Sequence, residues 1–314
     1  MHRFNENHPE LIGFSEYYAE TIFPKLEREE SVRLSKMQTI KKLWICLGIV
    51  GLLAVGSAIY MKVEIIKLVM IGAIFILLGY IIPFYIFRDV KSDTKNILMS
   101  SICRFLGWEY SEDGGAFAPF VQFTKLGLLS NRFDRVSFED WVTAIAHGTA
   151  FEFCETHMET HHKTKNGDSW RTIFRGQLLV LNLDRKFLGE TIVLRDKGMF
   201  NFERKGVLKR VGLVDPIFEK IFEVYSTDQV EARYLLTPTF MQKLVDLEQS
   251  VDGKKIRFAF SGGKLLIAVE TENRFEAGSM FDPLTSAERT QKILDEIGAI
   301  YDVIDGVVTQ KRPS

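Results

Sequence analysis

The sequence has little cysteine, little proline and no excess of charge of either sign. Three cysteines occur among the 314 residues, and no two of them have the CxxC spacing of a zinc or redox motif. The sequence therefore offers no disulfide framework and no cysteine-based zinc signature, and it suits a reducing compartment. The eight prolines and 25 phenylalanines are typical of a folded chain rather than a disordered one. The three cysteines are Cys46, Cys103 and Cys154.

The balance of charge argues against one class of partner. The chain carries 40 Lys and Arg against 41 Asp and Glu, a formal net charge of −1, whereas dedicated nucleic-acid binders usually show a basic excess. We therefore expect no nucleic-acid partner.

Two other sequence signals are missing. The SGGK at 261–264 is not a GxxxxGK[ST] phosphate loop, and we expect no cofactor. The first 40 residues are polar and charged, so we expect no cleavable signal peptide.

Two long apolar runs stand out near the N-terminus. Residues Leu43–Met61 and Leu68–Phe87 contain no charged side chain, and each matches the roughly 20 residues that cross a bilayer as a helix. The short connector 62–67 permits only an antiparallel hairpin. Two buried core helices are the alternative, but buried helices rarely run this long without a charge. Ion channels and transporters usually carry ionisable residues inside their membrane spans. Neither run contains one, so a transporter is disfavoured.

The orientation of this hairpin is predicted by the cations at its ends. Lys and Arg are concentrated on the cytoplasmic side of membrane proteins, and here they flank the two runs while the connector holds only Lys62 and Lys67. We therefore predict a multi-pass membrane protein with both termini in the cytoplasm. The flanking cations are Arg28, Arg33, Lys36, Lys41, Lys42, Arg88, Lys91, Lys95 and Arg104.

The predicted organisation has three parts. Residues 1–42 form a cytoplasmic helical segment, 43–87 the transmembrane hairpin, and 88–314 a cytoplasmic α+β domain. In the first part, apolar residues recur at helical spacing over 11–40, and Pro24 is placed to open a second helix that continues into the first span. This segment lies either on the membrane surface or on the domain; its mixed charges favour the domain.

Small residues such as Gly48 and Gly51 allow close packing within the hairpin or between copies, and the oligomeric state stays open.

The rest of the chain predicts an antiparallel sheet with helices on one face. Residues 96–135 read as helical or irregular, and Ser137 with Asp140 resembles a capping box. Strands are expected over 149–160, 170–183 and 190–195, the first two joined by an Asn166–Gly167 turn. The remaining signals are a loop at 198–206, caps at Asp215–Pro216, at Ser226 with Gln229 and at Thr237–Pro238, a hairpin over 255–270 with Gly262–Gly263 at its turn, and a helix over 286–304.

The strongest candidate for a chemical site is the stretch FEFCETHMETHH, 151–162. In an extended strand Glu155, His157, Glu159 and His161 point to one face, and such ligands suit zinc or a similar ion. Positions two apart on one flat strand rarely converge without a partner element, however, and His147 is isolated in the sequence. We therefore interpret the stretch as a solvated strand face, with the metal site as the alternative.

Two further candidates read as structural. The polar run Tyr225–Gln229, with Glu231 and Arg233, could form an acid–base cluster, but helix capping explains Ser226 and Gln229 without chemistry. Cys154 has no base beside it in the sequence.

The chain resembles a bacterial membrane-protein family known as domain of unknown function 3137. The likeness is carried by FEVYSTDQVEARYLLTPTFMQKLVDL (222–247), KIRFAFSGGKLLIAV (255–269), IFRGQLLVLNL (173–183), FDRVSFEDWV (133–142), FEFCE (151–155) and FSEYYAETIFPKLE (14–27). It implies a module tethered to the bacterial inner membrane, sometimes accompanied by LemA-type membrane proteins. The family supplies no agreed catalytic residue, so none is transferred.

Two functions from different classes remain open. The first is a membrane-anchored cytoplasmic binding or scaffold module of unknown ligand, which is not an enzyme. The second is a membrane-tethered, metal-dependent hydrolase that uses the His/Glu strand at 155–162. The absence of a catalytic motif in the sequence favours the first.

Overall fold

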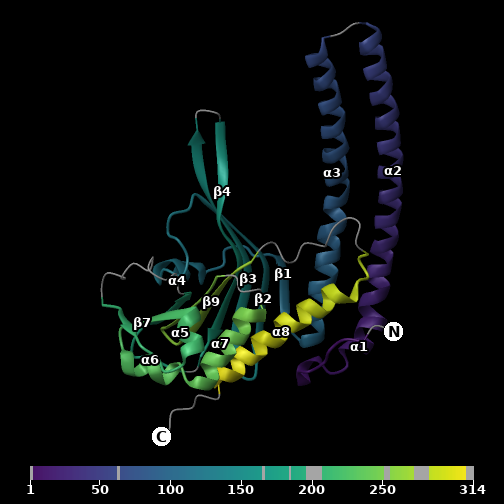
Figure 1. The fold of residues 1–314 in the computed structure, drawn as a ribbon. Helices are drawn as coiled ribbons and strands as arrows, with labels where there is room; N and C mark the ends of the chain where they lie inside the picture. Colours follow the sequence, from purple (N-terminus) through teal and green to yellow (C-terminus); the bar gives the residue numbers. More distant parts are fainter. Residues whose placement is uncertain are drawn as a thin grey trace. The chain divides into compact units, whose positions relative to one another are not determined.

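The computed structural model describes residues 3–61, 64–164, 167–183, 185–195, 207–250, 255–271 and 283–308. The chain divides into two compact units. Unit 1 comprises Met1–Phe4, Gly13–Ser101 and Phe275–Thr290, and unit 2 comprises Asn5–Ile12, Ile102–Arg274 and Gln291–Ser314. Figure 1 shows the helices of unit 1 and the sheet of unit 2. The α+β class and the antiparallel sheet are confirmed.

Unit 1 is helical. A short helix α1 (Phe14–Tyr17) and a π-turn η2 (Tyr18–Ile22) lead into α2 (Phe23–Tyr60), and α3 (Ile65–Leu106) follows. Pro24 lies in the first turn of α2, as predicted, directly after the π-turn. The helix then runs 38 residues without a break into the first apolar run. The apolar stripe of the N-terminal segment is buried by protein; its fully buried members include Phe14, Tyr18, Ile22 and Leu26.

The helices α2 and α3 lie side by side (Figure 1). The indole Nε1 of Trp44 donates a hydrogen bond of 2.9 Å to the carbonyl oxygen of Gly79. Further along the pair, the ring of Phe75 lies 3.5 Å from where a Cβ at Gly51 would be. That is an ordinary van der Waals distance, so the two helices are in close contact at Gly51.

Of the described helical segments, one is long and apolar enough to cross a membrane. It is the continuous helical stretch Pro9–Tyr60, and 6% of its most apolar window is buried. The described apolar part of α3, Val69–Pro83, is shorter. Two residues of the predicted connector, 62 and 63, lie outside the described residues, as do the side chains at 65, 68, 84 and 87–92. The structure thus supports a first span, and the second stays a prediction.

The described part of unit 2 forms a nine-stranded sheet in the order β1-β2-β3-β4-β9-β8-β5-β7-β6, in which every neighbouring pair is antiparallel. The two longest strands are β3 and β4, which form a hairpin. The strands are β1 (Glu109–Asp113), β2 (Arg135–Ala146), β3 (Thr149–Thr164), β4 (Gly167–Asn182), β5 (Thr191–Arg195), β6 (Lys209–Val211), β7 (Phe222–Ser226), β8 (Ile256–Ser261) and β9 (Lys264–Glu270).

Both faces of the sheet are covered. On one face, α4 (Phe120–Lys125) packs in a core cluster with Leu178 and Val180 of β4 and with Leu266 of β9. Side chains alternate along a strand, so Phe258 and Phe260 of β8 face the other side. There the ring of Phe240 from α7 (Pro238–Ser250) meets Phe260 at 6.0 Å. The expectation of helices on one face is thus corrected, because α4 and its flanking loops close the second face.

Two of the predicted caps and the predicted β8–β9 turn are confirmed. Asp215 accepts hydrogen bonds from the first turn of α5 (Pro216–Ile221), α7 begins at Pro238, and Gly262 and Gly263 form the β8–β9 turn with φ of 59° and 81°. The last helix, α8, spans Ala287–Val308. The predicted loop at 198–206, and Asn166 of the predicted β3–β4 turn, lie outside the described residues.

Two predicted caps were wrong. Ser137 and Asp140 lie in strand β2, so they cap no helix; Asp140 has a φ of 54° beside a register shift between β2 and β3. The helix α6 (Gln229–Leu235) is capped by Asp228, whose side chain accepts from Val230 and Glu231, while Ser226 ends strand β7. The aspartate prevails because it sits directly before the first helical residue, where its carboxylate reaches the free N–H groups.

Candidate functional site

The four predicted metal candidates lie on β3, and each has its own partner. The ring Nε2 of His157 lies 2.8 Å from the hydroxyl of Thr172 on β4 and 4.0 Å from a carboxylate oxygen of Glu159. Burial lowers the pKa of His157, which favours the neutral ring. Glu159 in turn accepts a hydrogen bond from Arg135 of β2, and this bond lowers the pKa of Glu159.

The two outer members of the set are equally engaged. Glu155 is buried beside Arg175, at 3.9 Å. His161 lies 3.2 Å from the carboxylate of Asp168 and 4.9 Å from the ring of Trp170. Among the described residues, no three His, Cys, Asp or Glu side chains come together so that they could hold a metal ion. The metal site therefore stays a prediction. The contacts given for these side chains are with Arg, Thr, Trp and Asp of neighbouring strands and between His157 and Glu159.

The other two candidates serve the fold. Burial raises the pKa of the Cys154 thiol to about 12, so at neutral pH it is not a thiolate nucleophile. In the polar run, Ser226 is buried and donates to the Glu190 carbonyl oxygen at 3.0 Å. Just beyond the run, Glu231 accepts hydrogen bonds of 2.9 Å from the backbone N–H groups of both Leu188 and Gly189.

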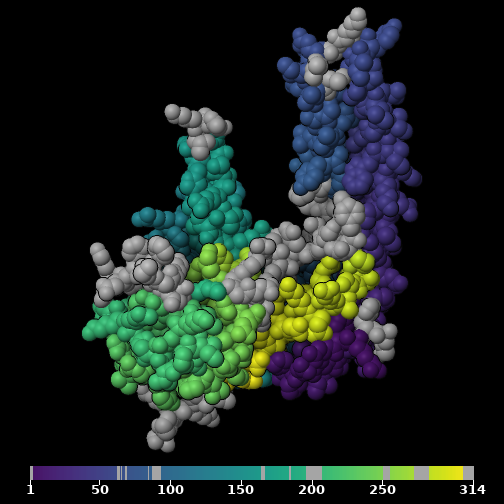
Figure 2. All heavy atoms as spheres, in the orientation of Figure 1, coloured from purple at the N-terminus to yellow at the C-terminus, as the bar shows by residue number. Residues whose placement is uncertain are grey.

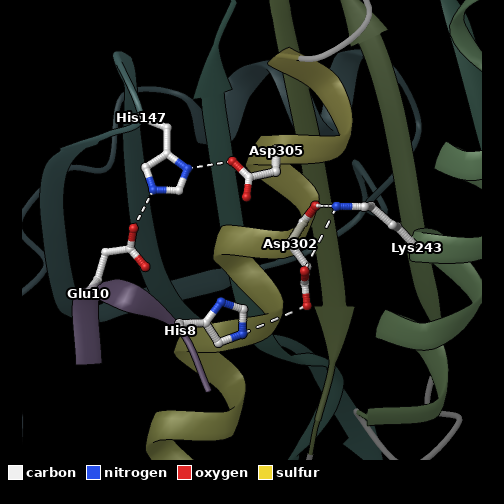
Figure 3. A network of polar contacts seen from close by, with 6 residues as sticks. All are labelled: His8, Glu10, His147, Lys243, Asp302 and Asp305. Atoms are coloured by element: carbon white, nitrogen blue, oxygen red, sulfur yellow. Dashed lines mark hydrogen bonds and ion pairs between the residues drawn. The ribbon is translucent and has the colours of Figure 1, made fainter. Parts of the chain in front are cut away.

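A polar network that the sequence did not reveal lies elsewhere in unit 2 (Figure 3). At its centre is His147, in the turn between β2 and β3, with a left-handed φ of 50°. Its Nε2 lies 2.5 Å from a carboxylate oxygen of Glu10, and its Nδ1 is hydrogen-bonded to the carboxylate of Asp305 on α8. Because each nitrogen faces a carboxylate, both must carry a proton for both bonds to form, and the arrangement favours the imidazolium.

The electrostatics of this centre follow from the two carboxylates. The hydrogen bonds to Glu10 and Asp305 raise the pKa of His147, against a smaller effect of burial. Burial acts to raise the pKa of Glu10, but the hydrogen bond and charge of His147 prevail and lower it. The two groups therefore stabilise each other's charged form, as expected for an ion pair.

The network continues along α8. His8 lies 3.9 Å from the carboxylate of Asp302, and the Nζ of Lys243 on α7 donates to the Asp302 carbonyl oxygen at 2.9 Å. The ring of Tyr301 packs beside both histidines, 6.1 Å from His8 and 5.4 Å from His147. Burial raises the pKa of Tyr301 to about 12, so its hydroxyl stays neutral.

This network fastens three parts of unit 2 to one another. It joins the segment Asn5–Ile12 to the β2–β3 turn and to α8, with Lys243 adding α7. His147 is isolated in the sequence, and its partners in the fold lie 137 and 158 residues away along the chain. No local spacing could have found them. The geometry is that of an electrostatic clasp, and the participating side chains are partly exposed.

Comparison with known proteins identifies part of the chain. Residues 172–307 match the model of a family described as "Protein of unknown function (DUF3137)", so this part belongs to that family, as the resemblance implied. The similar stretches at 14–27, 133–142 and 151–155 lie before the matched residues. No curated protein matches the chain.

One solved structure is similar, the crystal structure of the mycobacterial trehalose monomycolate transport factor A, TtfA. The two chains share 14% sequence identity at a TM-score of 0.37, over 70% of this chain and 97% of that one. A TM-score of this size does not establish a shared fold.

Proposed function

We propose that this chain, whose residues 172–307 belong to the DUF3137 family, is a membrane-anchored binding or scaffold module of the bacterial inner membrane. In this proposal α2 and α3 cross the bilayer as a hairpin, and unit 2 lies in the cytoplasm. One observation carries it: both helices expose large apolar side chains. Leu52 and Leu53 on α2 are 75% and 68% exposed, and Ile76 on α3 is 76% exposed. Contiguous apolar surface of this kind marks contact with a membrane or a partner.

The second span is supported by sequence and by packing. The predicted run Leu68–Phe87 has the roughly 20 residues that a crossing needs, and the Trp44–Gly79 hydrogen bond pairs α3 with the apolar part of α2. The flanking cations support cytoplasmic termini.

Binding rather than catalysis is supported by what the reactive side chains do. Cys154 is buried as a thiol, Glu231 holds two backbone N–H groups, and the charges of Glu159 and Arg135 neutralise each other. These contacts build the sheet and its connections. We further propose, from the family resemblance, that LemA-type membrane proteins are among the partners. Crosslinking in native membranes, followed by affinity purification of the full chain, tests this partner directly.

Topology is tested with a reporter enzyme that is active only in the periplasm. Fused after Ser314, it should give no signal; inserted between Lys62 and Val63, it should give a strong one, because the connector then lies outside. A signal at both positions would mean that the chain crosses the bilayer an odd number of times. A signal after Ser314 alone would reverse the orientation. Release of the untagged chain from membranes by alkaline carbonate would refute the anchor itself.

A further inference from the structure

The segment Asn5–Ile12, which we name the strap, lies along the helix α8. At its start the backbone N–H of Asn5 donates to the side-chain oxygen of Gln291 on α8, at 2.8 Å. Further along, the ring of His8 lies so close to Gly298 that a Cβ there would be 2.7 Å from its Nε2, and a side chain at this position would displace the ring. Figure 2 shows the purple N-terminal atoms, to which the strap belongs, at the surface beside the yellow atoms of α8.

Few contacts hold the strap in place. Leu11 is buried, and the other side chains of the strap are exposed or partly exposed. Segments with so little burial open locally at a small cost in free energy. The clasp, in which His147 joins Glu10 of the strap to Asp305 of α8, therefore supplies a large share of what keeps the strap closed.

We propose that the clasp is a pH-sensitive switch: the strap is closed while the imidazolium of His147 bridges Glu10 and Asp305, and it opens when that ring loses a proton on the alkaline side of neutrality. The proton passes to solvent, which reaches the partly exposed ring, and no covalent bond changes. The inference does not depend on the proposed anchor, because every contact that it uses lies within unit 2.

Loss of the proton removes one of two hydrogen bonds. The ring nitrogens of His147 face one carboxylate each, Glu10 at Nε2 and Asp305 at Nδ1. An ionised carboxylate only accepts hydrogen bonds, and a neutral imidazole carries a single N–H. One of the two carboxylates must therefore lose this donor when the ring becomes neutral.

Loss of the proton also leaves the strap facing like charge. Three carboxylates gather at this place, Glu10 from the strap and Asp302 and Asp305 from α8 (Figure 3). They are faced by the imidazolium of His147 and by Lys243 of α7, whose Nζ lies 3.9 Å from the Asp302 carboxylate. When His147 is neutral, the charge that joined Glu10 to α8 is gone, and the like charges that remain repel each other.

Two further titratable groups pack beside this centre. The ring of Tyr301 on α8 lies 5.4 Å from that of His147, and burial raises the pKa of Tyr301 to about 12, so its hydroxyl stays neutral while the histidine titrates. His8 of the strap lies 3.9 Å from the Asp302 carboxylate and is a second imidazole at the same interface. Variants must therefore separate the two rings.

The direction of the switch follows from the clasp itself. The hydrogen bonds to Glu10 and Asp305 raise the pKa of His147, so the closed strap keeps the proton above the ordinary histidine value of about 6.5. Burial acts to raise the pKa of Glu10, but the hydrogen bond and charge of His147 lower it overall, so the glutamate stays ionised down to its ordinary value of about 4.3. The strap therefore opens as the pH rises through the pKa of His147, and mild acidification leaves it closed.

Opening changes how unit 2 is fastened to the N-terminal part of the chain. The strap is preceded by Met1–Phe4 and followed by Gly13–Ser101, and both of these segments belong to unit 1. A closed strap thus fastens this part of the chain to unit 2 by hydrogen bonds and charge. An open strap leaves the covalent connections after Ser101 and at the two ends of Phe275–Thr290.

Hydrogen exchange of the full chain in detergent, at pH 6 and pH 9, tests the switch. The amides of Leu11 and Ile12, which donate to the carbonyl oxygens of His8 and Pro9, report on the strap. Their rates are expressed as protection factors, so that the intrinsic pH dependence of exchange cancels. We expect their protection to fall about tenfold from pH 6 to pH 9, because the contacts at stake are charge-assisted but partly exposed. The amides of Leu178–Leu181, between β3 and β9, should keep their protection.

Variants separate the switch from a general effect of pH. In His147→Asn the strap should be as weakly protected at pH 6 as the wild type is at pH 9, whereas the matched control His162→Asn on β3 should behave as the wild type. Glu10→Gln keeps an acceptor for the ring but removes the charge of the strap, so the fall in protection should shrink to less than about threefold. This variant replaces a partly exposed side chain with one of the same shape, so it keeps the test decisive if His147→Asn does not fold.

Four results would overturn the inference. The first is equal protection of the strap in the wild type at the two pH values, and the second is an undiminished fall in Glu10→Gln. The third is loss of the transition in His8→Asn while His147→Asn retains it. The fourth is a parallel fall at Leu178–Leu181 in the wild type, because unit 2 as a whole would then loosen.

Discussion

Replacing His147 with asparagine should destabilise unit 2, and more at pH 6 than at pH 9. Asparagine tolerates the left-handed backbone at this position better than most residues, so the backbone is preserved. It cannot carry the proton that joins Glu10 and Asp305. The variant therefore leaves two carboxylates facing each other without the cation between them.

The expected loss follows from two magnitudes. Hydrogen bonds to charged groups contribute roughly 1.5 to 3 kcal/mol when buried, whereas exposed ion pairs contribute about 0 to 1 kcal/mol. The side chain of His147 is 34% exposed and those of Glu10 and Asp305 are 24% and 45% exposed. Solvent therefore screens both contacts, and we expect a loss of about 1 to 2 kcal/mol for the two together.

The sign of the pH dependence is fixed by the direction of the shift. Folding raises the pKa of His147 above its usual value, so its contribution is fully present below the unfolded pKa of about 6.5 and is lost as pH rises through the folded pKa. Glu10 has a lowered pKa, so its contribution requires a pH above its unfolded value of about 4.3. The difference between wild type and variant is therefore largest between these limits.

The measurement is denaturant unfolding of the full chain in detergent at pH 6 and pH 9. His162→Asn is the matched control, since His162 is an exposed residue of β3 near Thr160, and it should change stability by less than about 0.5 kcal/mol. An equal loss at both pH values, or a larger loss at pH 9, would show that the clasp is not electrostatic.

Three further changes test the sheet, a helix cap and the predicted metal candidates. Gly176→Ala should cost about 2 to 4 kcal/mol in unfolding experiments, because its Cβ would lie 1.9 Å from the Val269 carbonyl oxygen; loss below 0.5 kcal/mol would contradict the close approach of β4 and β9. Asp215→Ala should cost about 1 kcal/mol by removing the cap of α5, and Asp215→Asn should restore most of it. Replacing His157 and His161 with Gln should cost less than about 1 kcal/mol, with no change in bound metal by elemental analysis; stoichiometric metal lost in the variant would revive the hydrolase hypothesis.

Local signals predicted much of unit 2 because their physics is local. Asp215 followed by proline begins a helix whatever surrounds it, since the carboxylate satisfies N–H groups two and three residues ahead. Gly262 and Gly263 both adopt positive φ, which the two-residue turn of a hairpin requires. The alternating pattern from Thr149 likewise marked β3, although the strand continues four residues past the predicted end at Thr160.

The features that escaped prediction depend on distant partners. Strand β1 is short, polar and mostly exposed, and its pairing with β2 defines it as a strand. Strand β2 was obscured because Asp140, at a register shift with a positive φ, breaks the alternation of side chains. The clasp at His147 was invisible for the same reason: its residues share no period or motif, and the fold alone brings Glu10 and Asp305 to the same ring.

The clasp also bears on how unit 2 can be isolated. Asn5–Ile12 belongs to unit 2, although α2 and most of α3 separate it from the sheet in the sequence. It brings Glu10 to His147 and contributes Leu11, which is 2% exposed. A soluble fragment that begins at residue 96 would omit both. Losing the burial of the Leu11 side chain alone costs roughly 1.5 to 3 kcal/mol of folding free energy. The chain leaves unit 2 after Ile12, returns after Ser101, and leaves it once more over Phe275–Thr290. A stable fragment must therefore join residues 5–12 to 102–308 through a linker in place of α2 and most of α3.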